Sequence, residues 1–248
     1  MSVVILFCNL YQIHPPAARP ARKPGKGLSR MPRSVDVDRF LAALAAHLYG
    51  SAAMAPGAAA DVADFARQVA GLIGSAAPDS GPAGSSSLPV CRHWSPALAA
   101  SIAALRQPLA RLAARLHWTQ TAHYRHAPPS PAFLDNYGYA VIAGPAAGAP
   151  ALVSSEALAL GVLLLGPHTH YPLHRHPAVE LYVVLTRGGR WRRGTRPWRI
   201  EPPGTVIHHP SLMPHATRSG ARPLLAVYLW RGDLATAARF VGRQRNEG

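Results

Sequence analysis

Apolar side chains recur at steps of three and four residues in the first half of the chain, which is the spacing of one face of an α-helix. A helix beginning near Asp36 carries them at Val37, Phe40, Leu41, Leu44 and Leu48. A second helix, with Asp61 as its expected cap, carries them at Val62, Phe65, Val69, Leu72 and Ile73. A third is expected from about Pro96 to Leu116, with a kink at Pro108. This half predicts a layer of packed helices.

The pattern changes after His126, where short apolar runs alternate with glycine and proline. Tyr137, Tyr139, Val141 and Ile142 predict one strand, and further runs follow: ALALGVLLLG, ELYVVLT, WRRGTRPWRI, GTVIHH and LLAVYLW. Several short strands at this spacing are typical of a sandwich or barrel. We therefore predict a disordered, basic, proline-rich tail over 1–33, a helical region over 34–126 and a β-barrel domain over 127–248.

Composition excludes several classes of protein. Hydrophobic residues make up 48% of the 248 residues and charged residues 15%, so the chain is not disordered as a whole. Two cysteines, Cys8 and Cys91, exclude a disulfide framework and a cysteine-based zinc site. No apolar run approaches the roughly 20 residues of a membrane helix. A cytoplasmic location without membrane contact is expected.

The net charge of +15 comes almost entirely from arginine and does not by itself indicate nucleic-acid binding. One basic cluster lies in the tail and another lies between Arg187 and Arg199, where Trp191 and Trp198 interrupt it. Nucleic-acid binding would use such a stripe with interleaved aromatic rings. Because no nucleic-acid motif accompanies it, we interpret the second cluster as a solvated hairpin rim and expect no nucleic-acid partner.

Candidate chemistry gathers in one histidine-rich segment. Six of the 13 histidines lie between residues 168 and 209, and His215 follows closely. If the central segment is a strand, its alternation puts four polar side chains on one face: His174, His176, Glu180 and Tyr182. Two neutral imidazoles and a carboxylate suit one divalent transition metal, namely Zn²⁺, Fe²⁺, Mn²⁺, Ni²⁺ or Co²⁺. A distant histidine usually completes such a site; His215 is the best candidate, with His208 and His209 as rivals.

Two motifs resemble those of the cupin superfamily. The spacing G-x₇-H-x-H-x₃-E, from Gly166 to Glu180, resembles the first cupin motif, and P-x₃-P-H, from Pro210 to His215, resembles the second. The glycine that normally closes the first motif, Gly188, comes one residue late. The resemblance implies a mainly β fold: a double-stranded β-helix, or jelly-roll barrel, preceded here by a small α-helical layer, with one metal ion in the barrel.

Four further segments narrow the resemblance. FLDNYGYA (133–140), GVLLLGP (161–167), YPLHRHPAVELYVVL (171–185) and PLLAVYLWRGDL (223–234) together are similar to the cupin-type dimethylsulfoniopropionate lyases, the DddL/DddQ type. The similarity covers residues 95 to 240 and includes tyrosines outside the metal-binding pattern. It implies a bacterial carbon–sulfur lyase that converts the zwitterion dimethylsulfoniopropionate by β-elimination to dimethyl sulfide and acrylate.

The resemblance also implies roles for single residues. Tyr182 is the expected general base, and whether it also coordinates the metal is left open. The expected metal ligands are His174, His176, Glu180 and His215. Aromatic faces bind sulfonium cations, and the candidates for this contact are Tyr171, Trp230, Tyr137 and Tyr139. A homodimer is compatible with such a barrel and is also left open.

Two other classes of function remain alternatives. Another metal-dependent cupin enzyme, such as a dioxygenase or a sugar-phosphate isomerase, would share three histidines and a glutamate. Tyr182 favours the lyase, because a dioxygenase needs no such base. A non-catalytic cupin that binds a ligand or DNA is the second alternative. It would be expected to carry a helix-turn-helix, whereas residues 36–73 are interpreted as packing helices.

Overall fold

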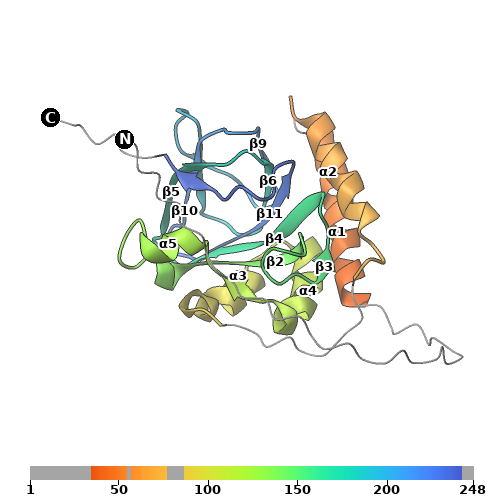
Figure 1. Cartoon of the computed structure of the whole chain (residues 1–248), viewed down its shortest axis with the longest axis horizontal. Coiled ribbons are helices and arrows are strands. Elements are labelled where there is room, and N and C mark those ends of the chain that lie inside the picture. The colour runs from red at the N-terminus through yellow and green to blue at the C-terminus, as the bar shows by residue number, and fades with distance from the viewer. Residues whose placement is uncertain (1–34, 55–56, 77–86, 242–248) are drawn as a thin grey trace, which may run out of the picture. The chain divides into compact units, whose positions relative to one another are not determined.

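The computed structural model describes residues 35–54, 57–76 and 87–241. The predicted disordered tail over 1–33 lies outside the described residues. Helices come first along the chain and strands dominate after residue 136 (Figure 1). The helices are α1 (Val35–Ala52), α2 (Ala59–Gly71), α3 (Trp94–Ala99), α4 (Ala103–Leu112) and α5 (Ala122–His126), with single 3₁₀ turns at η1 (Pro89–His93), η2 (Ala113–Arg115) and η3 (Leu134–Asn136).

The first two helices form where the apolar spacing predicted them, except that α2 ends at Gly71, before Leu72 and the exposed Ile73, and the predicted cap of α2 is wrong. Asp61 lies inside the first turn of α2, and the residue at the cap position is Ala58, which makes no side-chain capping bond. Asp61 instead forms an ion pair with Arg231 at the far end of the chain. Its acidic side chain therefore joins the helical layer to the β-strands. None of the described helices is long and apolar enough to cross a bilayer.

The third predicted helix is two helices, and the break is not at Pro108. The chain leaves the helical conformation at Ile102, whose backbone has φ −57° and ψ 139°. The Ile102 amide donates a hydrogen bond to the carbonyl of Leu185, at 3.2 Å. Pro108 lies within α4. The break is thus set by a tertiary hydrogen bond, which the local apolar spacing does not encode.

Two antiparallel sheets follow. The first contains, in order, β1 (Trp118–Thr119), β2 (Tyr137–Gly144), β4 (Leu158–Leu165), β11 (Leu224–Arg231), β6 (Val179–Val184) and β9 (Val206–His209); β3 (Val153–Ser154) pairs parallel to β2. The second contains β12 (Arg239–Phe240), β5 (His170–Arg175), β10 (His215–Arg218), β7 (Arg190–Arg193) and β8 (Arg199–Ile200). Helices and sheets belong to one compact unit. The arrangement is a β-barrel of two sheets with helices packed on one of them.

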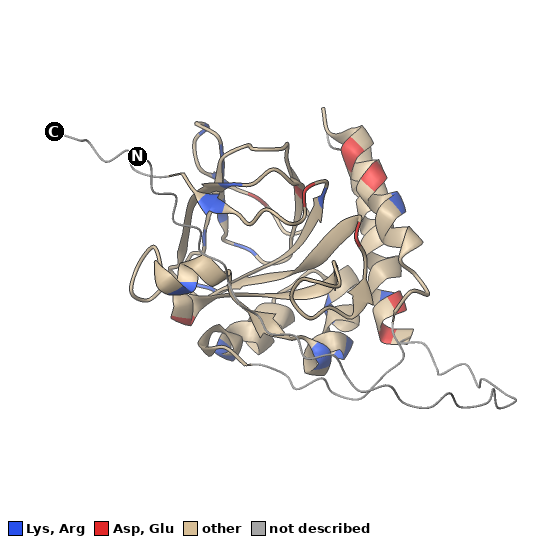
Figure 2. Ribbon diagram, in the orientation of Figure 1, with Lys and Arg blue, Asp and Glu red and all other residues tan. Residues whose placement is uncertain are grey.

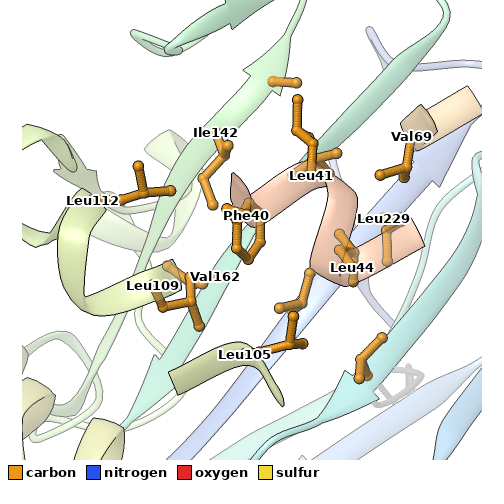
Figure 3. Packing of buried hydrophobic residues seen from close by; sticks show 14 of the residues in the cluster. Phe40, Leu41, Leu44, Val69, Leu105, Leu109, Leu112, Ile142, Val162 and Leu229 are labelled. Carbon is orange, nitrogen blue, oxygen red and sulfur yellow. The ribbon is translucent and has the colours of Figure 1, made fainter. Parts of the chain in front are cut away.

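The two faces of the first sheet serve two different cores. In β6, Leu181 and Val183 belong to the core shared with the helices, while Tyr182 and Val184 belong to an aromatic core inside the barrel. Figure 3 shows the first core, in which Phe40 of α1 lies among leucines of α4 and residues of β2 and β4. Phe40 is fully buried, and burial of a side chain of this size contributes about 1.5–3 kcal/mol. The helical layer therefore packs against the sheet that carries Glu180, Tyr182 and Trp230 of the candidate site.

The histidine-rich segment is not a single strand, which corrects the prediction based on simple alternation. His174 lies on β5 of the second sheet, and Glu180 and Tyr182 lie on β6 of the first. His176 and Pro177 fall in the connection between them. Proline has no backbone amide hydrogen to donate to a neighbouring strand, so Pro177 suits the connection between β5 and β6. The polar side chains still meet, because both strands turn these residues toward the barrel interior.

Candidate active site

Three histidines from two parts of the chain converge in the barrel. His174 on β5 and His215 on β10 are cross-strand partners, and His176 follows just beyond the end of β5. All three are at least 97% buried. One ligand nitrogen from each lies within 4.8 Å of the others. Of the three candidates for the distant histidine, His215 lies in this group, and His209 lies with Glu180 and His215 in a second group of the same kind.

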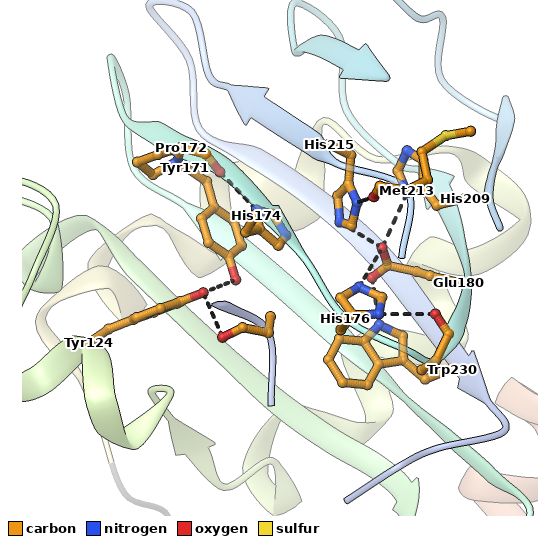
Figure 4. Close-up of polar contacts among 12 residues, drawn as sticks. Tyr124, Tyr171, Pro172, His174, His176, Glu180, His209, Met213, His215 and Trp230 are labelled. Carbon is orange, nitrogen blue, oxygen red and sulfur yellow. Dashed lines mark hydrogen bonds and ion pairs between the residues drawn. The ribbon is translucent and has the colours of Figure 1, made fainter. Parts of the chain in front are cut away.

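Each of these imidazoles is anchored in the same way. Their Nδ1 atoms lie 2.8, 3.0 and 2.9 Å from backbone carbonyl oxygens two residues away, those of Pro172, Ala178 and Met213 respectively (Figure 4). In the tautomer in which Nδ1 donates to the carbonyl, Nε2 keeps a free lone pair. The Nε2 atoms of His176 and His215 are buried without a hydrogen-bond partner among the described residues. This is how metal-binding histidines are oriented in proteins.

Glu180 supplies a carboxylate to the same cluster. Its Oε2 lies 3.0 Å from Nε2 of His215 and 3.4 Å from Nε2 of His176. Burial opposes its ionisation, but the charge interaction with His215 and the close contacts of the surrounding histidines outweigh burial and hold its pKa well below the usual range. Burial lowers the pKa of His174 well below its usual value, so that imidazole is neutral. Neutral imidazoles with an ionised carboxylate are the donor set that a divalent transition metal requires.

A cavity of about 750 Å³ opens beside Glu180. Six aromatic side chains line it: Tyr137, Tyr139, Tyr171, Tyr182, Tyr228 and Trp230. The five aromatic residues predicted from the sequence for the base and for substrate contact are therefore all on this cavity, and Tyr228 is an addition. The volume is that of a pocket for a small molecule.

Two of these aromatic residues also pack on the histidines. Tyr171 stacks on His174, with ring centroids 4.1 Å apart and an angle of 11° between the planes. Trp230 stacks on His176 at 4.0 Å and donates a hydrogen bond from Nε1 to Oε1 of Glu180, at 2.6 Å. The aromatic wall and the histidine cluster are therefore one packed assembly.

Tyr182 lies between the cavity and the histidines. It follows Glu180 by two residues on β6 and is 4% exposed, and its ring centroid is 6.4 Å from that of His215. Burial raises the pKa of its hydroxyl well above 10, and the neighbouring Glu180 carboxylate raises it further. A phenolate at this position therefore requires added positive charge nearby.

The charge of the cavity wall is opposite to that of the whole chain. Of the described residues that line it, none is lysine, arginine or histidine, whereas Glu156, Glu180 and Asp233 are acidic. The chain carries 26 basic residues and 11 acidic ones. Among the described residues, arginines are distributed over the helices and the barrel (Figure 2). The cavity is thus suited to a cationic group.

Three other histidines and tryptophans of the predicted region, His170, His208 and Trp198, make contacts away from the cavity. His170 contacts Trp198, and His208 faces Asp61 of α2 at 3.3 Å. Trp191 is buried against Tyr182 inside the barrel, with ring centroids 5.0 Å apart. Trp191 therefore offers no exposed ring within the basic hairpin.

The sequence interpretation did not name Tyr228 and kept His209 only as a rival of His215, although alternation along their strands indicates that both face inward. Tyr228 is two residues from Trp230 on β11, so it shares the inward face. His209 is two residues from the buried Ile207 on β9, and its Nδ1 lies 3.2 Å from Oε2 of Glu180. Burial lowers the pKa of His209 to about 3.

Fold and site together define a class: a cupin-type barrel with a helical N-terminal layer and with four histidines and a glutamate in its interior. The sequence profile of the dimethylsulfoniopropionate lyase family matches residues 63–226. The chain therefore belongs to the dimethylsulfoniopropionate lyase family.

Two curated relatives support this assignment. The chain is 36% identical over 135 residues to dimethylsulfoniopropionate lyase DddQ of Ruegeria pomeroyi, covering 54% of this chain and 64% of the relative. It is 29% identical over 150 residues to a putative dimethylsulfoniopropionate lyase DddL of Cereibacter sphaeroides, covering 58% and 60%. The matches thus span a little under two thirds of the length of these relatives.

Solved structures show the same architecture. The crystal structure of DddQ from Ruegeria pomeroyi aligns with a TM-score of 0.58 and 29% identity, over 82% of this chain and 97% of that one. A chain from the crystal structures of the lyases RdDddP and RnDddQII aligns with a TM-score of 0.63 and 23% identity, over 84% and 98%. The predicted cupin barrel with preceding helices is confirmed.

Proposed function

We propose that this protein is a metal-dependent lyase that cleaves dimethylsulfoniopropionate to dimethyl sulfide and acrylate, with Tyr182 as the general base. The observation that carries the proposal is the position of Tyr182. It lies on the cavity wall, two residues along β6 from the carboxylate that faces the histidine cluster. Family membership supports this reaction, and the position of Tyr182 on the cavity wall supports its role as the base.

The proposed metal ligands are His174, His176, Glu180 and His215. The support is the backbone anchoring of all three imidazoles, together with the buried Nε2 atoms of His176 and His215, which, like that of His209, make no hydrogen bond among the described residues. When bound, a divalent cation supplies positive charge that stabilises the substrate carboxylate as charge develops on it and favours the phenolate form of the nearby tyrosine.

The sulfonium end of the substrate is a permanent cation. Aromatic faces attract such a cation by roughly 0.5–2 kcal/mol each, and Tyr171, Trp230, Tyr137 and Tyr139 are the proposed contacts. The acidic and aromatic wall, without a basic side chain among its described residues, supports a substrate with this charge. The carboxylate end then points toward the histidine cluster, because the two ends of the substrate carry opposite charges.

In the proposed step, the Tyr182 oxygen takes a proton from the carbon next to the substrate carboxylate. The electron pair of that C–H bond forms the carbon–carbon double bond of acrylate. The carbon–sulfur bond breaks, and its electron pair leaves with sulfur as neutral dimethyl sulfide. Burial of the tyrosine restricts water around the reacting atoms, so the proton stays on Oη until the products leave.

Headspace gas chromatography tests the proposal. Purified protein is loaded separately with Mn²⁺, Fe²⁺, Ni²⁺, Co²⁺ or Zn²⁺ and incubated with dimethylsulfoniopropionate, in air and without oxygen. We expect dimethyl sulfide and acrylate in equal amounts, loss of both with a chelator, and no dependence on oxygen. Absence of product from folded, metal-loaded protein would contradict the proposal, and oxygen consumption with substrate loss would favour a dioxygenase.

A further inference from the structure

His209 is the cross-strand neighbour of Glu180. The two residues pair in the ladder between β9 and β6, and His209 is 1% exposed. Alternation along β9 turns His208 the other way, toward Asp61 of α2. The strand β9 therefore presents His209 to the barrel interior and His208 to the helical layer. Only His209 faces the cluster.

The Glu180 carboxylate is held from both neighbouring strands. On β11, the cross-strand partner Trp230 donates from Nε1 to Oε1 at 2.6 Å. On β9, Nδ1 of His209 lies 3.2 Å from Oε2. Each carboxylate oxygen therefore has a hydrogen-bonding partner from a different strand (Figure 4), and His209 is the donor in the tautomer that carries its proton on Nδ1. A carboxylate restrained in this way cannot rotate freely, and such outer contacts orient metal-binding side chains.

His209 also contacts a second member of the cluster. Its ring stacks on His215 with centroids 4.1 Å apart and an angle of 11°. It differs from the three other histidines, because its Nδ1 faces a carboxylate and not a backbone carbonyl. A direct ligand role is the competing explanation, since Glu180, His209 and His215 also present ligand atoms within 4.8 Å of one another.

We propose that His209 is a positioning residue: it donates a hydrogen bond from Nδ1 to Glu180 and so fixes the carboxylate for metal binding. The inference rests on the proposed metal-dependent function. We favour positioning over direct ligation because Nδ1 of His209 faces Glu180, whereas Nδ1 of each of the other three histidines faces a backbone carbonyl oxygen.

Two substitutions separate the two roles. In His209→Asn the side-chain amide nitrogen keeps a donor near the position of Nδ1 but removes Nε2. In His209→Leu a side chain of similar bulk has no donor. We expect His209→Leu to weaken Co²⁺ binding about 10- to 100-fold, and His209→Asn to restore affinity to within a few-fold of the wild type. His208→Asn is the matched control and should bind Co²⁺ like the wild type.

Affinity is measured by titrating metal-free full-length protein with Co²⁺ against a chelator, with the visible absorption of the bound ion as a second readout. Equal affinity of His209→Leu and the wild type would overturn the inference. Equal weakening in both His209 variants, with the same change of the Co²⁺ spectrum, would also overturn it and indicate a direct ligand. Thermal unfolding verifies that each variant is folded, and a folded Trp230→Phe variant provides an independent test of the same carboxylate.

This experiment separates the inference from the proposed function. Wild-type protein that binds Co²⁺ and releases no dimethyl sulfide with any metal would contradict the lyase and leave the role of His209 intact. Undiminished Co²⁺ affinity in His209→Leu, with normal release of dimethyl sulfide by the wild type, would contradict the role of His209 alone.

Discussion

Gly161 on β4 leaves the space that the ring of Tyr228 on β11 occupies. The two residues are cross-strand partners, and a β-carbon built on Gly161 would lie 2.7 Å from the Tyr228 hydroxyl oxygen and 2.9 Å from Cε1. It would also meet the backbone carbonyl of Ala140. Tyr228 lines the cavity. A glycine on the neighbouring strand therefore sets the position of one aromatic ring of the cavity wall.

Gly161→Ala should displace Tyr228 and strain β4. We expect a loss of stability of about 1–3 kcal/mol, typical of overpacking a core, and a raised KM for dimethylsulfoniopropionate. Urea unfolding and steady-state kinetics measure the two effects. Gly50→Ala in α1 is the control: its β-carbon meets nothing within 4 Å, and alanine should stabilise the helix by roughly 0.5–1 kcal/mol. Unchanged stability and KM in Gly161→Ala would show that Tyr228 does not depend on this space.

Trp230→Phe keeps an aromatic ring near His176 and removes the donor to Glu180. Because one carboxylate oxygen then loses its restraint, metal affinity should fall about tenfold or more. Chelator competition with Co²⁺ measures it. Trp198→Phe, where the tryptophan lies beneath Arg218 on the second sheet, should leave affinity unchanged. Wild-type affinity in Trp230→Phe would mean that the 2.6 Å bond does not orient the carboxylate.

Asp233 supplies negative charge to the cavity wall. The Thr236 hydroxyl and nearby amides donate to it and lower its pKa, so it is ionised at neutral pH. Asp233→Asn keeps an oxygen acceptor for these amides and removes the charge. KM should rise roughly two- to fivefold at low ionic strength, and the difference should shrink at 1 M salt, as expected for an exposed charge. Asp135→Asn, away from the cavity, is the control; an equal KM in both variants at low salt would exclude electrostatic attraction by Asp233.

Much of the fold follows from the sequence because its signals are local. The spacing of Phe40, Leu41 and Leu44 predicts α1, and the alternation in ELYVVLT predicts β6 with Tyr182 facing inward. The motif from Gly166 to Glu180 predicts which polar residues meet. These features could be predicted because the spacing of apolar residues follows the buried face of a helix or strand.

Other features depend on contacts between distant residues. The break within the third predicted helix is set by the bond from Ile102 to Leu185, and the place of Asp61 by its pair with Arg231. His209 joins the site because β9 pairs with β6, which no spacing within GTVIHH shows. The predicted metal ligands, the cytoplasmic location and the homodimer stay predictions.

Glu180→Gln tests the charge of the donor set while keeping its shape. The amide can still accept from Trp230, but it offers no negative charge to a cation, so bound metal should fall well below one equivalent. Elemental analysis of purified protein by mass spectrometry measures this. His170→Gln, on the same segment but in contact with Trp198, should keep full metal content. Full metal content in Glu180→Gln would remove Glu180 from the proposed ligands.

Tyr182→Phe tests the central claim most directly, because it removes one oxygen from the cavity wall and leaves the ring. The variant and the wild type are loaded with the same metal, and metal content and dimethyl sulfide release are measured on the same samples. We expect unchanged metal content and a loss of turnover of about a hundredfold or more, the contribution of a general base. Turnover close to that of the wild type, with full metal content, would contradict Tyr182 as the base and the mechanism built on it.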